Sequence, residues 1–275
     1  MKQLRKTRVL ITNDDGVGSV NLHALALALS EVSDVYVFAP EDEQSGVGHA
    51  FTIRRGLRIQ HVETVPGKAK MPYEVYSVSG TPADCVKFAV GHFANYGLDD
   101  NSIVPEGFDV CFSGVNVGEN SGVSSLYSGT VAGAREAALW GVPAVALSLR
   151  GLKGNLLQVA IDFARKIVSQ NLFKKISKGV FWNVNFPKVK EDEFLGFKAC
   201  TMDRGMFTDH YDHKDGLWFL DGEKLWSMAP EGSDDNLLDK GYATITPHRI
   251  DQTDEESLDV ISEMLGSDDF FFPLI

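Results

Sequence analysis

Cysteine is scarce in this sequence, which limits how the fold can be held together. The 275 residues include three cysteines, Cys85, Cys111 and Cys200. Their wide separation gives neither a disulfide framework nor the spacing of a zinc motif. Cys85 and Cys111 lie in apolar runs, which predicts buried, reduced thiols. The chain must therefore rely on a hydrophobic core. Its length and its apolar fraction of 44% suffice for one large domain, or one domain with an appendage.

Positive charge is also in short supply. The chain has 26 Lys and Arg residues against 38 Asp and Glu residues, a formal net charge of −12. A nucleic-acid polymer is not expected as a partner, because no basic surplus is available to displace its counterions. A small anionic substrate is still compatible with this charge. It would need a local positive centre, such as a bound divalent ion.

Long apolar runs are missing too. The first one stops at Asn13, which is too short for a signal peptide, and no later run could span a bilayer. No internal repeat or low-complexity segment is present. We therefore expect a cytoplasmic protein with no membrane partner.

The sequence does contain a strand–helix–strand pattern. Apolar residues 9–11 predict a buried strand, residues 20–29 a helix, and residues 34–39 a second strand closed by Pro40. This is a βαβ unit, so the two strands should be parallel with a right-handed crossover. Further buried strands are expected at 108–112, 144–149 and 180–187. The fold class is therefore α/β, with a mostly parallel sheet and flanking helices.

Two adjacent carboxylates, Asp14 and Asp15, follow the first predicted strand. An Asp-Asp-Gly sequence by itself is typical of a polar turn. Neighbouring strand residues point to opposite faces, but a turn at Gly16 would let both side chains reach one site. Two carboxylates brought together are costly unless a cation or a proton lies between them. The alternative to a plain turn is thus a hard-metal site.

Three other segments should meet this site, because the carboxyl ends of parallel strands lie at one edge of the sheet. They are loop 41–50 with Ser45, the small-residue stretch 113–122 with Asn116, and the helix start at 128–130. Hard divalent ions take oxygen ligands, and a helix start with hydroxyls and free N–H groups can hold phosphate. Each segment alone is equally compatible with a solvated loop. His49 could relay a proton, or be merely solvated.

The second half of the chain looks less like an α/β core. Within the first half, strands at 57–62 and 73–78 suggest a hairpin or edge addition, and Thr81 and Pro82 start a capped helix. Beyond Pro187 we expect a hairpin at 218–226 turning at Asp221-Gly222, a helix at 233–240, a strand at 242–246 closed by Pro247, and a helix at 258–265. We therefore divide the chain into a catalytic core, 1–187, and a segment 188–275 with a hairpin arm, a strand returning to the core and a C-terminal part.

Seven stretches, taken together, resemble one known family. They are Thr12-Asn13-Asp14-Asp15-Gly16, Ala39-Pro40 with Gln44-Ser45-Gly46 and His49, Ser79 to Val86, Ser113-Gly114-Val115-Asn116-Val117-Gly118, Tyr127-Ser128-Gly129-Thr130-Val131-Ala132, Asn183 to Pro187, and Gly241 to Pro247. In this order they resemble the SurE (survival protein E) family of metal-dependent nucleoside monophosphate phosphatases. The residues after Gly16, and the lack of an aspartate before Tyr127, depart from the family pattern and leave base preference open.

The resemblance implies a Rossmann-like α/β fold with a protruding β-hairpin and a C-terminal oligomerisation segment, in a homodimer or homotetramer. It implies one Mg²⁺ or Mn²⁺ ion per subunit, held by Asp14, Asp15, Ser45 and Asn116. The implied reaction is hydrolysis of nucleoside 5′-monophosphates, with loose specificity that extends to 3′-monophosphates and short polyphosphate. The expected phosphate or substrate contacts are Asn13, Gly46, Ser113, Gly114, Ser128, Gly129 and Thr130.

Our hypothesis for the mechanism is in-line attack by a water, with Asp14, Asp15 and Asn116 as the catalytic residues. A covalent phospho-aspartate is a competing route, although the Asp-x-Asp spacing of haloacid-dehalogenase-type phosphatases is missing. Two other classes of function are a receiver-like signalling module and a metal-free nucleotide-binding module. Both predict binding without turnover.

Overall fold

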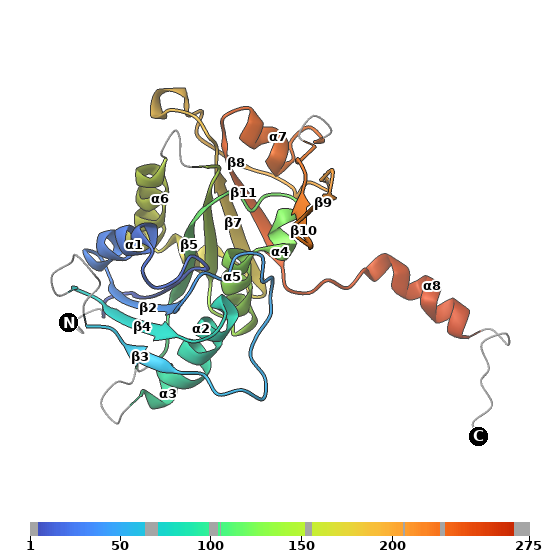
Figure 1. The fold of residues 1–275 in the computed structure, drawn as a ribbon. Coiled ribbons are helices and arrows are strands. Elements are labelled where there is room, and N and C mark those ends of the chain that lie inside the picture. The colour runs from blue at the N-terminus through green and yellow to red at the C-terminus, as the bar shows by residue number, and fades with distance from the viewer. Residues whose placement is uncertain are drawn as a thin grey trace, which may run out of the picture.

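A nine-stranded sheet runs through the protein in the order β3-β4-β2-β1-β5-β6-β7-β11-β8 (Figure 1). The computed structural model describes residues 5–63, 71–98, 104, 106–151, 156–205, 207–225 and 229–266. All neighbouring strands from β4 to β7 are parallel, whereas β3 and β11 run antiparallel to β4 and β7. The sequence-based prediction of a mostly parallel α/β sheet is confirmed.

The strands of this sheet are β1 (Arg8–Thr12), β2 (Asp34–Pro40), β3 (Ile59–His61), β4 (Glu74–Val78), β5 (Val110–Val117), β6 (Ala144–Leu149), β7 (Val180–Phe186), β8 (Phe197–Ala199) and β11 (Ala243–Arg249). The helices are α1 (Val20–Ser30), α2 (Pro82–Phe88), α3 (Ala94–Tyr96), α4 (Ser124–Tyr127), α5 (Gly129–Leu139), α6 (Leu157–Ser169), α7 (Asp234–Asp239) and α8 (Glu255–Leu265). Three helical turns and two hairpin strands complete the described secondary structure: η1 (Ala89–Phe93), η2 (Leu172–Lys175), η3 (Glu191–Glu193), β9 (His210–Lys214) and β10 (Leu217–Asp221).

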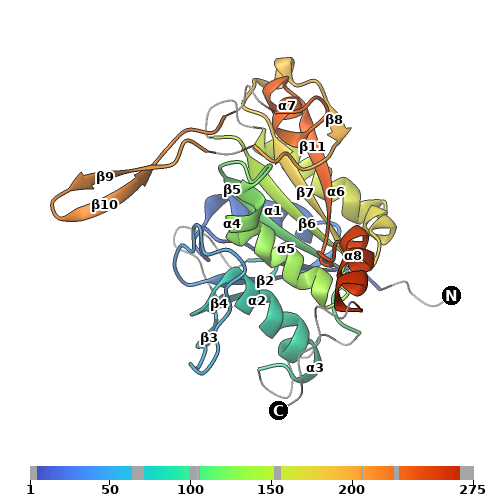
Figure 2. The same ribbon diagram turned by 90° about the vertical axis from the view of Figure 1, so that its right-hand side faces the viewer.

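Helices cover both faces of the sheet. Helices α1 and α6 pack on one face, and α2 and α5 on the other, each over its own apolar cluster (Figures 1 and 2). The strands between them are apolar on both faces, and all six residues of β6 are buried. Cys85 and Cys111 lie in the α2–α5 layer as buried free thiols, as predicted.

Strand β5 is longer than the sequence suggested. We expected a loop from Ser113, because small and polar residues begin there, but the strand continues to Val117. Its pairing with β6 shifts register after Ser113 and resumes at Asn116, opposite Ser148. Neighbouring strands therefore override the low strand propensity of the segment. Asn116 is consequently held on a strand rather than on a loop.

The hairpin arm is also placed differently. Strands β9 and β10 pair antiparallel across Asp215-Gly216, not Asp221-Gly222, and they project from the body (Figure 2). Both turn residues have positive φ, 52° and 79°, as a two-residue type I′ turn requires. The prediction of a hairpin at 218–226 was thus wrong, because it placed the turn after β10 instead of before it. The last residue of that predicted hairpin, Trp226, lies outside the described residues.

Other element ends differ by a few residues. Strand β11 does not stop at Pro247 but runs on to Arg249, paired with β7 on one side. Helix α8 begins at Glu255, three residues before the predicted start, and none of its residues is buried. The capped start of α2 is confirmed, with Thr81 and Asp84 forming a capping box. No helix among the described residues has the length and apolar character needed to cross a membrane.

Candidate metal and phosphate site

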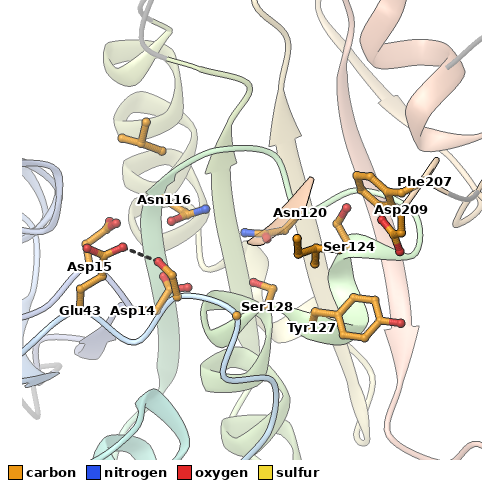
Figure 3. A pocket seen from close by; sticks show the side chains of 14 residues that line it. Asp14, Asp15, Glu43, Asn116, Asn120, Ser124, Tyr127, Ser128, Phe207 and Asp209 are labelled. Atoms are coloured by element: carbon orange, nitrogen blue, oxygen red, sulfur yellow. Dashed lines mark hydrogen bonds between the residues drawn. The ribbon is translucent and has the colours of Figure 1, made fainter. Parts of the chain in front are cut away.

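The carboxylates Asp14 and Asp15 leave β1 at the carboxyl edge of the parallel sheet. Gly16 has φ +92° and turns the chain there, and the Asn13 amide donates to the Gly16 carbonyl at 3.0 Å. Both aspartates then line a cavity of about 650 Å³ (Figure 3). The turn thus places neighbouring carboxylates in one cavity, which a continuing strand would not allow.

Asp14 is 4% exposed and is held by helix α5. The Thr130 hydroxyl donates to its Oδ1, and the Asp14 carbonyl accepts from the Gln44 N–H at 2.7 Å. A Cβ on Gly129 would lie 2.9 Å from the Asp14 Cβ, so the helix start approaches the aspartate as closely as glycine permits. Burial raises the pKa of Asp14, and the Thr130 hydrogen bond acts in the opposite direction. Helix α5 therefore fixes the orientation of this carboxylate.

Asp15 is less enclosed but electrostatically strained. Burial, and then the charges of Asp14 and Glu43, raise its pKa to about 6. Its Oδ2 atom is buried and accepts no hydrogen bond from the described part of the chain. Such an atom is costly unless a cation or donor reaches it. This carboxylate is the clearest position for a positive charge in the site.

Ser45 and Asn116 complete the set of predicted ligands, and both line the same cavity. The Asn116 Nδ2 donates to the Gly118 carbonyl at 2.9 Å, which commits the amide nitrogen and leaves Oδ1 as the ligand atom. The exposed Ser45 donates to Glu43 at 2.6 Å, the bond dashed in Figure 3. All four side chains that we predicted as metal ligands therefore meet at one place, and all offer oxygen.

The predicted phosphate contacts divide into two groups. Gly46 and Ser128 line the cavity, and the Ser128 hydroxyl caps α5 by accepting from the Val131 N–H at 3.1 Å. Asn13, Ser113, Gly114, Gly129 and Thr130 are not among the residues that line the cavity. Asn13 shapes the turn at Gly16, whereas Gly129 and Thr130 support Asp14.

His49 does not line the cavity either. It contacts Glu136 on α5 at 2.8 Å, and a lysine and a tryptophan bind the same carboxylate. His49 thus anchors the loop that carries Ser45, which is neither of the roles that the sequence suggested for it.

Sequence reasoning missed several residues that line the cavity. Glu43 lies close to Asp15, whereas Tyr127, Phe207 and Asp209 form the opposite side (Figure 3). Leu220 also lines the cavity. Tyr127 could have been found, because it adjoins Ser128. Residues 207–220 carried no local signal, since the arm brings them to the site from far along the chain.

Fold and site together define a Rossmann-like α/β protein with an oxygen-rich, acidic pocket at the carboxyl edge of its sheet. Residues 9–209 match the family model for survival protein SurE. The chain is 34% identical over 266 residues to 5'-nucleotidase SurE of Flavobacterium psychrophilum, covering 94% of this chain and 98% of the relative. It is 35% identical over 268 residues to 5'-nucleotidase SurE of Fervidobacterium nodosum, covering 94% and 97%.

A solved structure agrees with these sequence matches. The crystal structure of the SurE protein from Aquifex aeolicus superposes with a TM-score of 0.75 at 27% identity, covering 94% of this chain and 99% of that one. The chain belongs to the SurE family.

Proposed function

We propose that this chain is a divalent-metal-dependent phosphatase that hydrolyses nucleoside 5′-monophosphates to nucleoside and phosphate. The observation that carries the proposal is the meeting of Asp14, Asp15, Ser45 and Asn116 in one cavity beside the start of α5. The names of the relatives, 5'-nucleotidase SurE, support the nucleotide substrate.

The donor set fits a hard divalent cation. It consists of two carboxylates, an amide oxygen and a hydroxyl, the ligand types that Mg²⁺ and Mn²⁺ prefer. The unpartnered Oδ2 of Asp15 and the raised pKa of that carboxyl support a cation at this position. Asp14, Asp15, Ser45 and Asn116 would therefore hold one ion per subunit.

When bound, such an ion supplies the charge that polarises a phosphoryl oxygen and acidifies a water. The remaining work falls to the chain. Thr130 and Gly129 fix the Asp14 carboxylate, and the Gly118 carbonyl fixes the Asn116 amide. At the start of α5 the Thr130 N–H donates to Asp14 and the Val131 N–H donates to Ser128, so this end of the helix acts on negative charge through its dipole. In the reaction a water adds to phosphorus, the P–O5′ bond breaks, and the nucleoside oxygen leaves with a proton.

The test is phosphate release from a panel of nucleoside monophosphates after chelation, with and without added Mg²⁺ or Mn²⁺. We expect release that depends on metal, and Asp14→Asn should lose both rate and bound metal. Asp34→Asn, at an exposed aspartate at the far end of β2, is the matched control. Nucleotide binding without metal-dependent release would instead indicate a binding or signalling module.

Substrate range and assembly extend this proposal. We infer that 3′-monophosphates and short polyphosphate are also hydrolysed, which the same assay measures. We further infer a homodimer or homotetramer, because helix α8 exposes Leu258, Val260, Ile261, Met264 and Leu265 and buries none of its residues. Light scattering should give a monomer mass if this inference is wrong.

A further inference from the structure

The cavity has two chemically different sides. Asp14, Asp15 and Asn116 lie on one side, and Phe207, Asp209 and Tyr127 on the other, with Asn120 between them (Figure 3). Its volume of about 650 Å³ is well above that of a phosphate group and falls in the range of small-molecule sites. If phosphate occupies the metal side, the other side must accept whatever the phosphate is attached to.

Large apolar side chains are left exposed on this second side. Tyr127 is 63% exposed and lies on this side with Phe207, and Leu220, which also lines the cavity, is 61% exposed. Apolar and aromatic surface exposed in a concave site is a mark of ligand binding. Aromatic side chains stack on nucleobases, since every base has a π face. The composition of this side therefore fits a base.

Phe207 is held in place by a buried ion pair. The Lys224 ammonium lies 5.9 Å from the centre of the Phe207 ring, and residues 207 and 224 form an isolated β-bridge. Lys224 in turn contacts Asp235 at 2.7 Å and the Ser121 carbonyl at 3.0 Å, with both charged groups nearly inaccessible to solvent. The base of the arm is thus locked to the cavity wall, so Phe207 is pre-organised.

Asn120 lies between the two sides and is fixed at three points. Its N–H donates to Asn185 and its carbonyl accepts from Asn183, both at 2.7 Å, while its Nδ2 donates to Ser148 at 2.9 Å. Among the described residues, no donor reaches its Oδ1. This atom is therefore an acceptor for a ligand donor, and a sugar hydroxyl is the donor expected between phosphate and base.

Asp209 adds selectivity to the apolar side. A carboxylate accepts hydrogen bonds only, so it favours bases that present N–H donors. Guanine presents N1–H and N2–H side by side and can bond both carboxylate oxygens, adenine and cytosine offer an amino group alone, and uracil offers a single N3–H. The same negative charge disfavours a phosphate group at this end.

We propose that Tyr127, Phe207 and Leu220 bind the nucleobase, that Asn120 binds the sugar, and that Asp209 makes guanine the preferred base. This inference rests on the proposed phosphatase function, because that function places the phosphate on the metal side of the cavity and the base on the other side. It assigns a specificity role to the base of the arm.

The test compares two matched pairs of variants in the full-length, metal-loaded protein. Asp209→Asn is matched by Asp212→Asn, which removes the same charge from the same arm. Leu220→Ala is matched by Leu217→Ala, at a leucine of the same strand that is 62% exposed but does not line the cavity. The first readout is kcat/KM for the 5′-monophosphates of guanosine, adenosine and uridine, each divided by kcat/KM for ribose 5-phosphate.

The second readout is binding of guanosine, adenosine and uridine by calorimetry, which requires no turnover. Asp209→Asn should lower the preference for guanosine over uridine by about tenfold in both readouts. Leu220→Ala should weaken binding of all three nucleosides by roughly three- to tenfold. Both control variants should leave these values unchanged.

Unchanged base preference in Asp209→Asn, or equal losses in the control variants, would overturn the inference while leaving the phosphatase intact. A protein that binds guanosine selectively but releases no phosphate would refute the proposed function alone. The two failures are therefore distinguishable.

Discussion

Glu136 on α5 offers a direct test of what holds the Ser45 loop in place. This carboxylate is 2% exposed. It contacts His49 and Lys87 at 2.8 Å each, and it accepts from the Trp140 indole at 2.9 Å. His49 belongs to the same loop as Ser45, so the Glu136–His49 contact fastens that loop to the helix whose first turn holds Asp14. Replacing Glu136 with Gln should therefore affect both stability and metal binding.

The expected magnitude follows from the pKa of Glu136. Burial acts to raise it, but hydrogen bonds from His49, Lys87 and Trp140 outweigh burial and lower the pKa from 4.5 to about 2. A folded-state pKa below the unfolded one stabilises the protein above pH 4.5, and this stability is lost as pH falls toward 2. The difference between the folded and unfolded pKa of Glu136 contributes about 3 kcal/mol to the free energy of unfolding at pH 7, and about half of that at pH 3.

A second estimate gives a similar value. Removing one partner of a buried ion pair costs about 3–5 kcal/mol. Lys87 is 40% exposed and can regain water when its partner is lost, which favours the lower end of that range.

The assay is urea unfolding of Glu136→Gln and of the parent protein at pH 7 and pH 3. Glu74→Gln is the control. Glu74 contacts His61 at 2.7 Å, close to the 2.8 Å between Glu136 and His49, but this pair lies on the surface. Its loss should cost under about 1 kcal/mol. Glu136→Gln should also weaken Mn²⁺ binding, because the Ser45 loop loses its anchor. An equal loss at both pH values, or no loss at pH 7, would refute the role given to Glu136.

Three further predictions concern the support of Asp14 and one half-buried histidine, His248. Gly129→Ala should lower metal affinity and phosphate release at least about tenfold with the fold retained, since the new Cβ would lie 3.1 Å from the Asp14 Oδ2. Thr130→Val removes the hydroxyl that donates to Asp14, and titration calorimetry should show Mn²⁺ affinity reduced about 10- to 100-fold. Burial, and then the charge of Arg135, lower the pKa of His248 from 6.5 to about 4. The folded state thus resists protonation, and stability should fall by roughly 2–3 kcal/mol between pH 6.5 and pH 4. His248→Gln should remove that slope in urea unfolding.

The central strands could be predicted because a strand buried on both faces is a continuous apolar run in the sequence. β6 was placed to the residue, since a strand buried on both faces is continuously apolar and Pro143 precedes it. β5 could not be bounded in this way. Its last residues, Ser113 to Val117, resemble a loop, and only pairing with β6 makes them a strand. Tertiary pairing has no signature within a single segment.

The hairpin β9–β10 is a second case in which the strand pairing could not be predicted from local sequence. Asp-Gly occurs twice, at 215–216 and 221–222, and either could form a type I′ turn. Strand β9 is polar and exposed and shows no apolar alternation, so nothing local identified it as the partner of β10. The far side of the cavity depends on this arm. The metal side was therefore predictable from strand ends, whereas Phe207 and Asp209 were not.

The charge of the cavity also predicts an order of binding. Asp14, Asp15, Glu43 and Asp209 line it, and no Lys, Arg or His does so in the described part of the chain. Carboxylates close together repel a phosphate dianion, the more so where low dielectric strengthens the field. We therefore expect a cation to be bound before phosphate can bind with useful affinity. Calorimetric titration of inorganic phosphate should show binding to Mn²⁺-loaded protein and none after chelation, and equal binding in both would contradict this electrostatic account.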